Sequence, residues 1–232
     1  MIGVPRLHLA SAGSTSDVAR ERALAGAPHG ALVTAAEQTA GRGRQGRVWT
    51  TQPGTALAMS MVVREGLSSG LVTLAAAVAV ARACGSEAMI KWPNDVVLDG
   101  RKVAGILAEG RPHEGWAVLG IGVNVAVAVE DLPEELRDRA GTLGRGVGDV
   151  EPFLMALLAH LDVALGAPDA EVLTAWRARD ALLGEPVAWG EGRGAGSGVA
   201  RGVDDAGHLV VERPDGTTTA LHAGEVHLAR RP

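Results

Sequence analysis

Cysteine is almost absent from this chain of 232 residues, which holds one residue of that type, Cys84. A single cysteine excludes an internal disulfide and a cysteine-rich zinc site. Long apolar runs are missing as well, because the longest one, residues 71–81, is far short of the ~20 residues that a membrane span needs. Residues 1–13 lack a basic segment followed by an apolar one, so no secretory signal is indicated. We therefore expect a soluble cytoplasmic protein with no membrane partner.

Positive charge is also in deficit. The chain has 22 lysine and arginine residues against 27 aspartate and glutamate residues, which gives a formal net charge of −5. An acidic chain is poorly suited to coating nucleic acid, so we expect no nucleic-acid partner. Glycine is plentiful, with 32 residues, but glycine and proline together stay below the roughly 25–30% that marks low complexity. With 47% apolar residues, the chain is expected to fold around a packed core.

Lysine and the side-chain amides are rare, and they cluster. The chain has only two lysines, Lys91 and Lys102, although arginine is common. Every asparagine and glutamine lies between residues 38 and 124. Biased codon usage would also make these residues scarce, but their clustering points to residues 38–124 as the region that carries chemistry.

The hydrophobic pattern predicts an α+β fold followed by a small all-β unit. Asp99-Gly100 is a strong signal for a two-residue hairpin turn, which favours mainly antiparallel strands with helices on one side. We place the boundary near residue 184, with a first domain over 1–183 and a second over 184–232 that docks on it. The expected strands of the first domain are 5–10, 31–37, 55–64, 89–91, 96–98, 102–109 and 116–125, and the expected helices are 18–25, 71–81, 133–140, 151–165 and 170–183.

A loop rich in glycine and arginine is the first candidate site. Residues 41–47 read Gly-Arg-Gly-Arg-Gln-Gly-Arg, and no acidic residue occurs between Glu37 and Glu65. Arginine binds carboxylates and phosphates with two parallel hydrogen bonds, and glycine lets backbone N–H groups approach an anion closely. A solvated loop would explain the pattern equally well. An RNA-binding segment would carry more aromatic residues than Trp49 alone.

Lys102 and the segment before it form the second candidate. Residues 91–95 read Lys-Trp-Pro-Asn-Asp, and the proline interrupts strand pairing, so Asn94 and Asp95 are expected to project at a strand end. Lys102 follows on the return strand of the hairpin, which would hold its side chain more rigidly than a loop. A lysine on a solvated strand face is the ordinary alternative.

Two further segments carry small or hydroxyl residues. Gly120 and Gly122 interrupt an apolar strand, which allows the close approach of a flat ligand or of another backbone segment. Close packing of the strand on a helix is the ordinary alternative. Residues 14–16 read Ser-Thr-Ser at an expected helix start, where they either cap the helix or bind a ligand.

In this order and spacing, the four features resemble the biotin protein ligase family. The motifs that carry the resemblance are Ser14-Thr15-Ser16, residues 38–49 (Gln-Thr-Ala-Gly-Arg-Gly-Arg-Gln-Gly-Arg-Val-Trp), Lys91-Trp92-Pro93-Asn94-Asp95, residues 101–107 (Arg-Lys-Val-Ala-Gly-Ile-Leu) and residues 120–124 (Gly-Ile-Gly-Val-Asn). They span at least residues 8–125, and the β-rich tail is also of the family's type.

The resemblance implies a fold and a reaction. The fold is an SH2-like mixed sheet with flanking helices, of the class II aminoacyl-tRNA synthetase and biotin synthetase type, followed by a small SH3-like β-barrel. The implied enzyme is a biotin–[acetyl-CoA-carboxylase] ligase, which joins biotin and ATP into biotinyl-5′-AMP. A lysine of a biotin carboxyl carrier protein, part of acetyl-CoA carboxylase or a related carboxylase, then takes the biotin. Mg²⁺ would arrive with ATP rather than occupy a fixed protein site.

The resemblance also assigns roles to residues. Lys102 and Arg42 are the implied catalytic cations, and the loop at 41–47 is expected to be disordered without ligand and to close over the reactive adenylate. The implied biotin-binding residues are Ser14, Thr15, Ser16, Gln38, Arg42, Gly43, Arg44, Lys102, Gly120 and Gly122. The residues implied to face ATP or the adenylate are Arg44, Arg47, Trp49, Asn94, Asp95 and Asn124.

Two departures from the family and two alternatives accompany this interpretation. Ser16 stands where many members have asparagine. Only 13 residues precede Ser14, so we expect a monofunctional ligase without the winged helix of regulatory members, and we leave a homodimer open. The nearest alternative is a lipoate ligase or octanoyltransferase of the same fold. Cys84 ends an alanine-rich helix, so we interpret it as structural rather than as a catalytic nucleophile. The other is a non-enzymatic module that binds anions or RNA.

Overall fold

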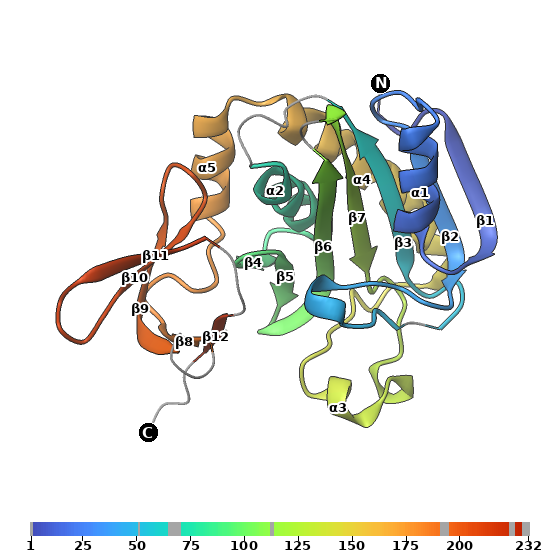
Figure 1. The fold of residues 1–232 in the computed structure, drawn as a ribbon. Helices are drawn as coiled ribbons and strands as arrows, with labels where there is room; N and C mark the ends of the chain where they lie inside the picture. Colours follow the sequence, from blue (N-terminus) through green and yellow to red (C-terminus); the bar gives the residue numbers. More distant parts are fainter. Residues whose placement is uncertain are drawn as a thin grey trace.

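A computed structural model describes residues 2–50, 52–64, 71–111, 114–190, 195–222 and 226–228. Its larger sheet has seven strands in the order β1-β2-β3-β7-β6-β5-β4 (Figure 1). β1 and β2 are parallel, and the helix between them makes the crossover connection that parallel neighbours need. The other neighbours in this sheet are antiparallel. The strands are β1 (Arg6–Ala12), β2 (Leu32–Gln38), β3 (Leu57–Val63), β4 (Met89–Lys91), β5 (Asp95–Leu98), β6 (Arg101–Arg111) and β7 (Trp116–Val123).

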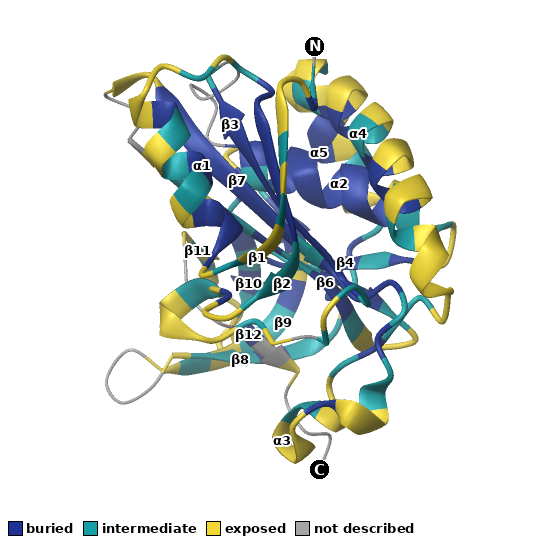
Figure 2. Cartoon of the chain, turned by 90° about the vertical axis from the view of Figure 1, so that its right-hand side faces the viewer, coloured by how far each residue is buried: buried dark blue, intermediate teal, exposed yellow. Residues whose placement is uncertain are grey.

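Helices cover both faces of this sheet, which corrects the prediction that they lie on one side. α1 (Thr15–Leu24) packs on one face, against β2, β3 and β7. α2 (Val72–Cys84) packs on the other face, and α4 (Val150–Gly166) and α5 (Asp169–Arg177) pack on α2 (Figure 2). A run of apolar residues indicates that a strand is buried. When a strand is buried on both faces, however, its sequence does not indicate which helix covers which face.

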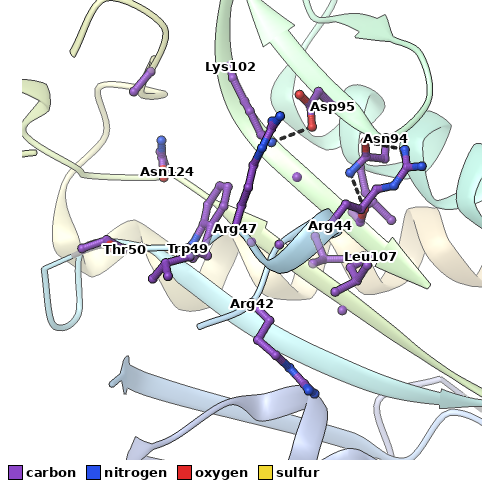
Figure 3. A pocket seen from close by; sticks show the side chains of 18 of the residues that line it. Arg42, Arg44, Arg47, Trp49, Thr50, Asn94, Asp95, Lys102, Leu107 and Asn124 are labelled. Atoms are coloured by element: carbon purple, nitrogen blue, oxygen red, sulfur yellow. Dashed lines mark hydrogen bonds and ion pairs between the residues drawn. The ribbon is translucent and has the colours of Figure 1, made fainter. Parts of the chain in front are cut away.

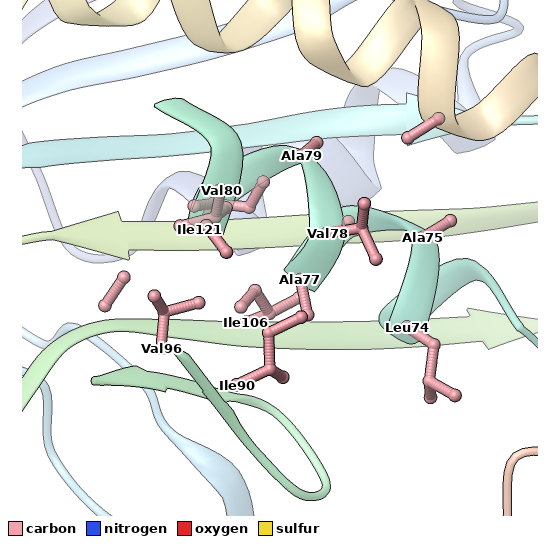
Figure 4. Packing of buried hydrophobic residues seen from close by; sticks show 14 of the residues in the cluster. Leu74, Ala75, Ala77, Val78, Ala79, Val80, Ile90, Val96, Ile106 and Ile121 are labelled. Atoms are coloured by element: carbon pink, nitrogen blue, oxygen red, sulfur yellow. The ribbon is translucent and has the colours of Figure 1, made fainter. Parts of the chain in front are cut away.

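The core between α2 and the sheet is built from small and branched side chains. Ala77 and Val80 of α2 are fully buried, and Figure 4 shows them beside Ile106 of β6 and Ile121 of β7. Because alanine has no side chain beyond Cβ, the helix can approach the strands closely and still leave room for the branched residues below it. The predicted helix over 71–81 is thereby confirmed, with an end three residues later at Cys84.

Two helices are shorter than predicted. α3 covers only Glu134–Arg137, and α5 ends at Arg177 instead of continuing to residue 183. The chain leaves α5 because its backbone pairs with the sheet edge at Ile90, whose N–H donates to Arg179 O over 2.7 Å and whose carbonyl accepts from Ala181 N over 2.9 Å. Short 3-10 helices also occur in the described part of the chain, at Arg44–Gly46, Val129–Asp131 and Val147–Asp149.

The C-terminal residues form a second sheet, as predicted. It is antiparallel throughout and has the order β11-β10-β9-β8-β12. Val187 and Leu209 of this sheet belong to the same buried core as α2, so the small sheet docks on the larger part. Its strands are β8 (Pro186–Trp189), β9 (Gly196–Val203), β10 (Leu209–Glu212), β11 (Thr218–Leu221) and β12 (Val226–Leu228). Within the described part of the chain, every helix is too short or too polar to span a bilayer.

One hydrogen bond ties the two sheets together beside the β4–β5 turn. The indole N–H of Trp92 donates to the carbonyl of Gly207 over 3.0 Å, and the Trp92 side chain is buried. Gly207 sits in a turn with φ near 80°, and a Cβ there would come within 2.8 Å of Leu71. The positive φ therefore favours glycine at this position, because another side chain would strain the turn that reaches Trp92.

Replacing Trp92 with phenylalanine is expected to lower the free energy of unfolding by about 1–3 kcal/mol, because the Gly207 carbonyl loses its buried donor. Urea unfolding measures this loss. Trp116→Phe is the matched control, because Trp116 is also buried but donates to the exposed residue Glu114. If both variants lose the same free energy of unfolding, the hydrogen bond between the sheets contributes no more to stability than the bond from Trp116 to Glu114.

Candidate active site

A pocket of about 390 Å³ opens where the glycine-arginine loop crosses β6 and β7 (Figure 3). Its size suits a small organic ligand. The structure brings together in this one pocket every residue that the sequence singles out for the site: Ser14, Thr15, Ser16, Gln38, Arg42, Gly43, Arg44, Arg47, Trp49, Asn94, Asp95, Lys102, Gly120, Gly122 and Asn124. Which ligand atom each residue would contact remains a prediction.

Buried hydroxyl groups form one wall of the pocket. Ser60 Oγ lies 2.8 Å from Thr15 Oγ1 and 3.0 Å from Ser16 Oγ. Thr15 also donates its backbone N–H and its hydroxyl to Gln38 Oε1, over 2.8 and 3.0 Å. Because its carbonyl oxygen is occupied in this way, Gln38 keeps its amide NH₂ as the group that can donate to a ligand. Ser14 caps α1, where its side chain accepts the backbone N–H of Ser16.

Positive charge gathers in another part of the pocket lining. Lys102 Nζ lies 2.6 Å from Asp95 Oδ1, and the hairpin holds both residues on neighbouring strands. Lys91 faces Asp95 across the β4–β5 pair, and burial lowers the pKa of Lys91, with Lys102 and Arg47 adding to the effect and Asp95 opposing it. Burial also lowers the pKa of Arg44. Cations that are crowded and partly desolvated in this way would be relieved by an anionic ligand.

The two asparagines of the site have structural partners. Asn94 donates its amide to Ile106 O over 2.7 Å and accepts a hydrogen bond from Arg44 over 3.3 Å. Asn124 is buried and donates its amide to Gly141 O over 2.8 Å. These contacts fix the β4–β5 turn and the segment after β7 against the pocket, and direct contact of either amide with the adenylate stays a prediction.

The glycines of β7 make room for other parts of the protein. A Cβ on Gly122 would come within 2.6 Å of the Trp49 indole, and one on Gly120 would come within 2.9 Å of Ser16 Oγ. The indole ring of Trp49 thus lies against this strand, and the close approach of a flat ligand stays a prediction. Lys102 Nζ lies 5.6 Å from the centre of that ring, so loop, strand and lysine meet at one place.

Arg42 lines the pocket but turns its guanidinium away from Lys102 (Figure 3). Its Nη2 lies 2.5 Å from Asp17 Oδ1 on α1. The cation is therefore paired with the protein's own carboxylate, and its predicted contact with the ligand would require that pair to rearrange.

No ligand-binding role is predicted from the sequence for Ser60, Lys91 or Arg139, although all three line the pocket. Ser60 is fully buried in the pocket wall, and the available signal was its position as the only polar residue of β3. Lys91 stands out by the rarity of lysine, but its strand position gave no role to it. Arg139 also lines the pocket and carries no signal, because it comes from a segment outside the motifs.

Cys84 lies outside this pocket, at the end of α2. Burial raises the pKa of its thiol to about 12. The thiolate is the nucleophilic form of cysteine, so this environment favours a structural role for Cys84.

The fold and the pocket define a member of the biotin/lipoate A/B protein ligase family, whose family model matches residues 10–125. A second family model, the biotin protein ligase C-terminal domain, matches residues 182–228. The chain therefore belongs to the biotin protein ligase family, and the resemblance drawn from the motifs is confirmed.

Three similar proteins illustrate the relationship. The biotin–[acetyl-CoA-carboxylase] ligase of Paracoccus denitrificans is 39% identical over 210 residues, which cover 80% of this chain and 85% of the relative. The bifunctional ligase/repressor BirA of Bacillus spizizenii is 36% identical over 221 residues, which cover 88% of this chain and 68% of the relative. A biotin protein ligase from Aquifex aeolicus, solved in complex with biotin and ATP, superposes with a TM-score of 0.81 at 28% identity and covers 97% of this chain and 99% of that one.

Proposed function

We propose that this chain is an ATP-dependent ligase that attaches biotin to a lysine of a biotin carboxyl carrier protein through biotinyl-5′-AMP. The observation that carries the proposal is the convergence of the cations Lys102, Lys91 and Arg44 and the hydroxyl wall of residues 14–16 on one pocket. The names of the Paracoccus and Aquifex proteins, one a biotin–[acetyl-CoA-carboxylase] ligase and the other complexed with biotin and ATP, support the choice of substrates and of the carboxylase carrier.

The first half-reaction joins two anions. A carboxylate oxygen of biotin attacks the α-phosphorus of ATP, the bond to the β-phosphate oxygen breaks, and pyrophosphate leaves. The barrier arises mainly from the need to position the two reactants and from the repulsion between their negative charges. Fixed cations reduce this repulsion. Lys102 is suited to this task because Asp95 and the hairpin hold its ammonium group in one place before the ligand arrives. Trp49 and the loop above it would limit the access of water to the adenylate.

In the second half-reaction, the carrier lysine attacks the acyl carbon of biotinyl-5′-AMP. The bond between that carbon and the phosphate oxygen breaks, AMP leaves, and the amine gives up a proton as the amide forms. The hydroxyl wall of Thr15, Ser16 and Ser60, with the amide of Gln38, is proposed to hold the biotin ring through both steps.

Magnesium is proposed to enter bound to ATP. Of the two carboxylates that line the described pocket, Asp95 is engaged by Lys102, and Asp138 is exposed to solvent. These groups fit an ion that the phosphates carry and the protein assists. A cytoplasmic location, a homodimer and the absence of a nucleic-acid partner remain expectations from the sequence.

Exchange of labelled pyrophosphate into ATP tests the proposal. The assay reports the first half-reaction alone, so the carrier protein is not needed. We expect exchange that depends on biotin and is absent with lipoate or octanoate. Exchange driven by lipoate or octanoate would instead favour the other branch of the family. Salt-dependent binding of oligonucleotides without any exchange would instead support a non-enzymatic module that binds anions.

A further inference from the structure

Four charged side chains from three segments form a closed ring beside the pocket. Arg42 Nη2 lies 2.5 Å from Asp17 Oδ1 and 3.6 Å from Glu109 Oε2. Arg20 Nη2 lies 3.2 Å from the same oxygen of Glu109, and Arg20 Nη1 lies 3.7 Å from Asp17 Oδ1. Each arginine therefore contacts both acids. Asp17 and Arg20 belong to α1 and Glu109 to β6, whereas Arg42 belongs to the glycine-arginine loop.

The ring bridges a cavity between the loop and the body of the protein. This second cavity is lined by loop residues 40–48 and by Asp17, Leu107 and Glu109. The side chains of Arg20, Arg42 and Glu109 are each about one-third exposed (36%, 35% and 35%), so water reaches the ring. One ion pair at such a site contributes little, but a network in which every charge has two partners is better ordered than an isolated pair.

The opposite side of the loop has a different attachment. Arg44 donates to Asn94 Oδ1 over 3.3 Å at the β4–β5 turn. Within the loop, Trp49 N donates to Gly41 O over 2.9 Å, which closes the segment on itself. Figure 3 shows Arg42 and Arg44 extending from the loop in different directions, one toward α1 and the other toward Asn94. The loop is thus fastened by Arg42 to α1 and β6 and by Arg44 to the β4–β5 turn.

We propose that Asp17 and Glu109 are positioning residues that hold the loop over the pocket through Arg42, with Arg20 keeping both carboxylates in place. This inference rests on the proposed function, because it concerns how the ligase retains its ligands. Ion pairs that water reaches can open without disturbing the apolar core, so they suit a loop that must release one substrate and admit the next. The two acids act on the reaction only through Arg42.

Limited digestion with trypsin tests the attachment directly, because the loop contains Arg42, Arg44 and Arg47 as cleavage sites. In the ligand-free full chain, the double variant Asp17→Asn/Glu109→Gln is expected to be cleaved in the loop about three- to tenfold faster than the wild type. Mass spectrometry of the fragments identifies the bond that is cut. Circular dichroism before digestion shows whether the variant is folded.

Glu21→Gln/Glu171→Gln is the matched control, since it also removes two negative charges, from exposed positions on α1 and α5. Its loop should be cleaved at the wild-type rate. The conservative variant Asp17→Glu/Glu109→Asp keeps both charges and should restore most of the protection. Equal cleavage of the double variant and the charge-matched control would overturn the proposal.

Kinetics separate a positioning role from a general loss of structure. In biotin-dependent pyrophosphate exchange, the double variant should raise the KM for ATP about three- to tenfold while kcat stays within about twofold of the wild type. A fall in kcat with KM unchanged would contradict the proposed role. If the wild type shows no exchange but cleavage still responds to Asp17 and Glu109, the proposed function fails and the attachment of the loop stands.

Discussion

Lys102→Ala is expected to slow biotin-dependent ATP–pyrophosphate exchange by at least about 30-fold, which corresponds to about 2 kcal/mol of lost transition-state stabilisation. The ammonium group of Lys102 is held 2.6 Å from Asp95 and 5.6 Å from the centre of the Trp49 ring. Alanine removes the cation and leaves the Asp95 carboxylate without this partner. The site then has less positive charge to attract the two anionic substrates, and the Asp95 carboxylate, no longer paired with Lys102, repels them.

Arg101→Ala provides the control for this prediction. Arg101 is the neighbouring cation on β6, is exposed, and lies outside the pocket lining. Its loss should leave exchange within about twofold of the wild type, because a screened surface charge acts weakly at a distance. If Lys102→Ala exchanges at the wild-type rate, Lys102 is not a catalytic residue.

Trp176→Ala is expected to lower the free energy of unfolding by about 3–5 kcal/mol. Trp176 is fully buried in α5, where α5 packs on α2, and it is among the largest side chains of the core. Truncation to alanine removes the whole indole and leaves a cavity that the two helices cannot easily close. Urea unfolding followed by circular dichroism measures the change, and the midpoint should fall while the slope is retained.

Trp176→Phe separates packing from hydrogen bonding at the same position. The indole N–H of Trp176 finds no partner among the described residues, so phenylalanine gives up no hydrogen bond there. We expect this variant to lose less than half of what the alanine variant loses. A loss below about 1 kcal/mol for Trp176→Ala would mean that α5 is not packed in the way described.

Local signals predicted much of the fold. The Asp99-Gly100 turn is confirmed because both residues adopt positive φ, at 50° and 73°, and few residue pairs allow this. The sequence predicts that α1 starts at residue 18, whereas Ser14 caps the helix and Thr15 already belongs to it. The end of α5 was also wrong, because the pairing of residues 179–181 with Ile90 depends on a strand far away in the sequence. Caps and turns are local, whereas such pairings are set by the tertiary fold.

The candidate site also has parts that local sequence signals predict and parts that depend on the tertiary fold. Glycine, lysine and asparagine stood out by their rarity or by their position within strands, and all of those singled out converge on the pocket. Ser60 was missed because a lone serine in an apolar strand is ordinarily neutral. The ring around Arg42 could not be predicted, because Asp17 and Glu109 become its neighbours only when α1 and β6 are placed side by side.

The bond from Trp92 to Gly207 has a consequence for protein engineering. A chimera that exchanges the C-terminal sheet for that of a relative would keep this donor and replace its acceptor turn. Grafts should therefore keep the glycine at position 207 and its bend, and a junction chosen by sequence similarity alone risks loosening Trp92, and with it the pocket wall, from a distance.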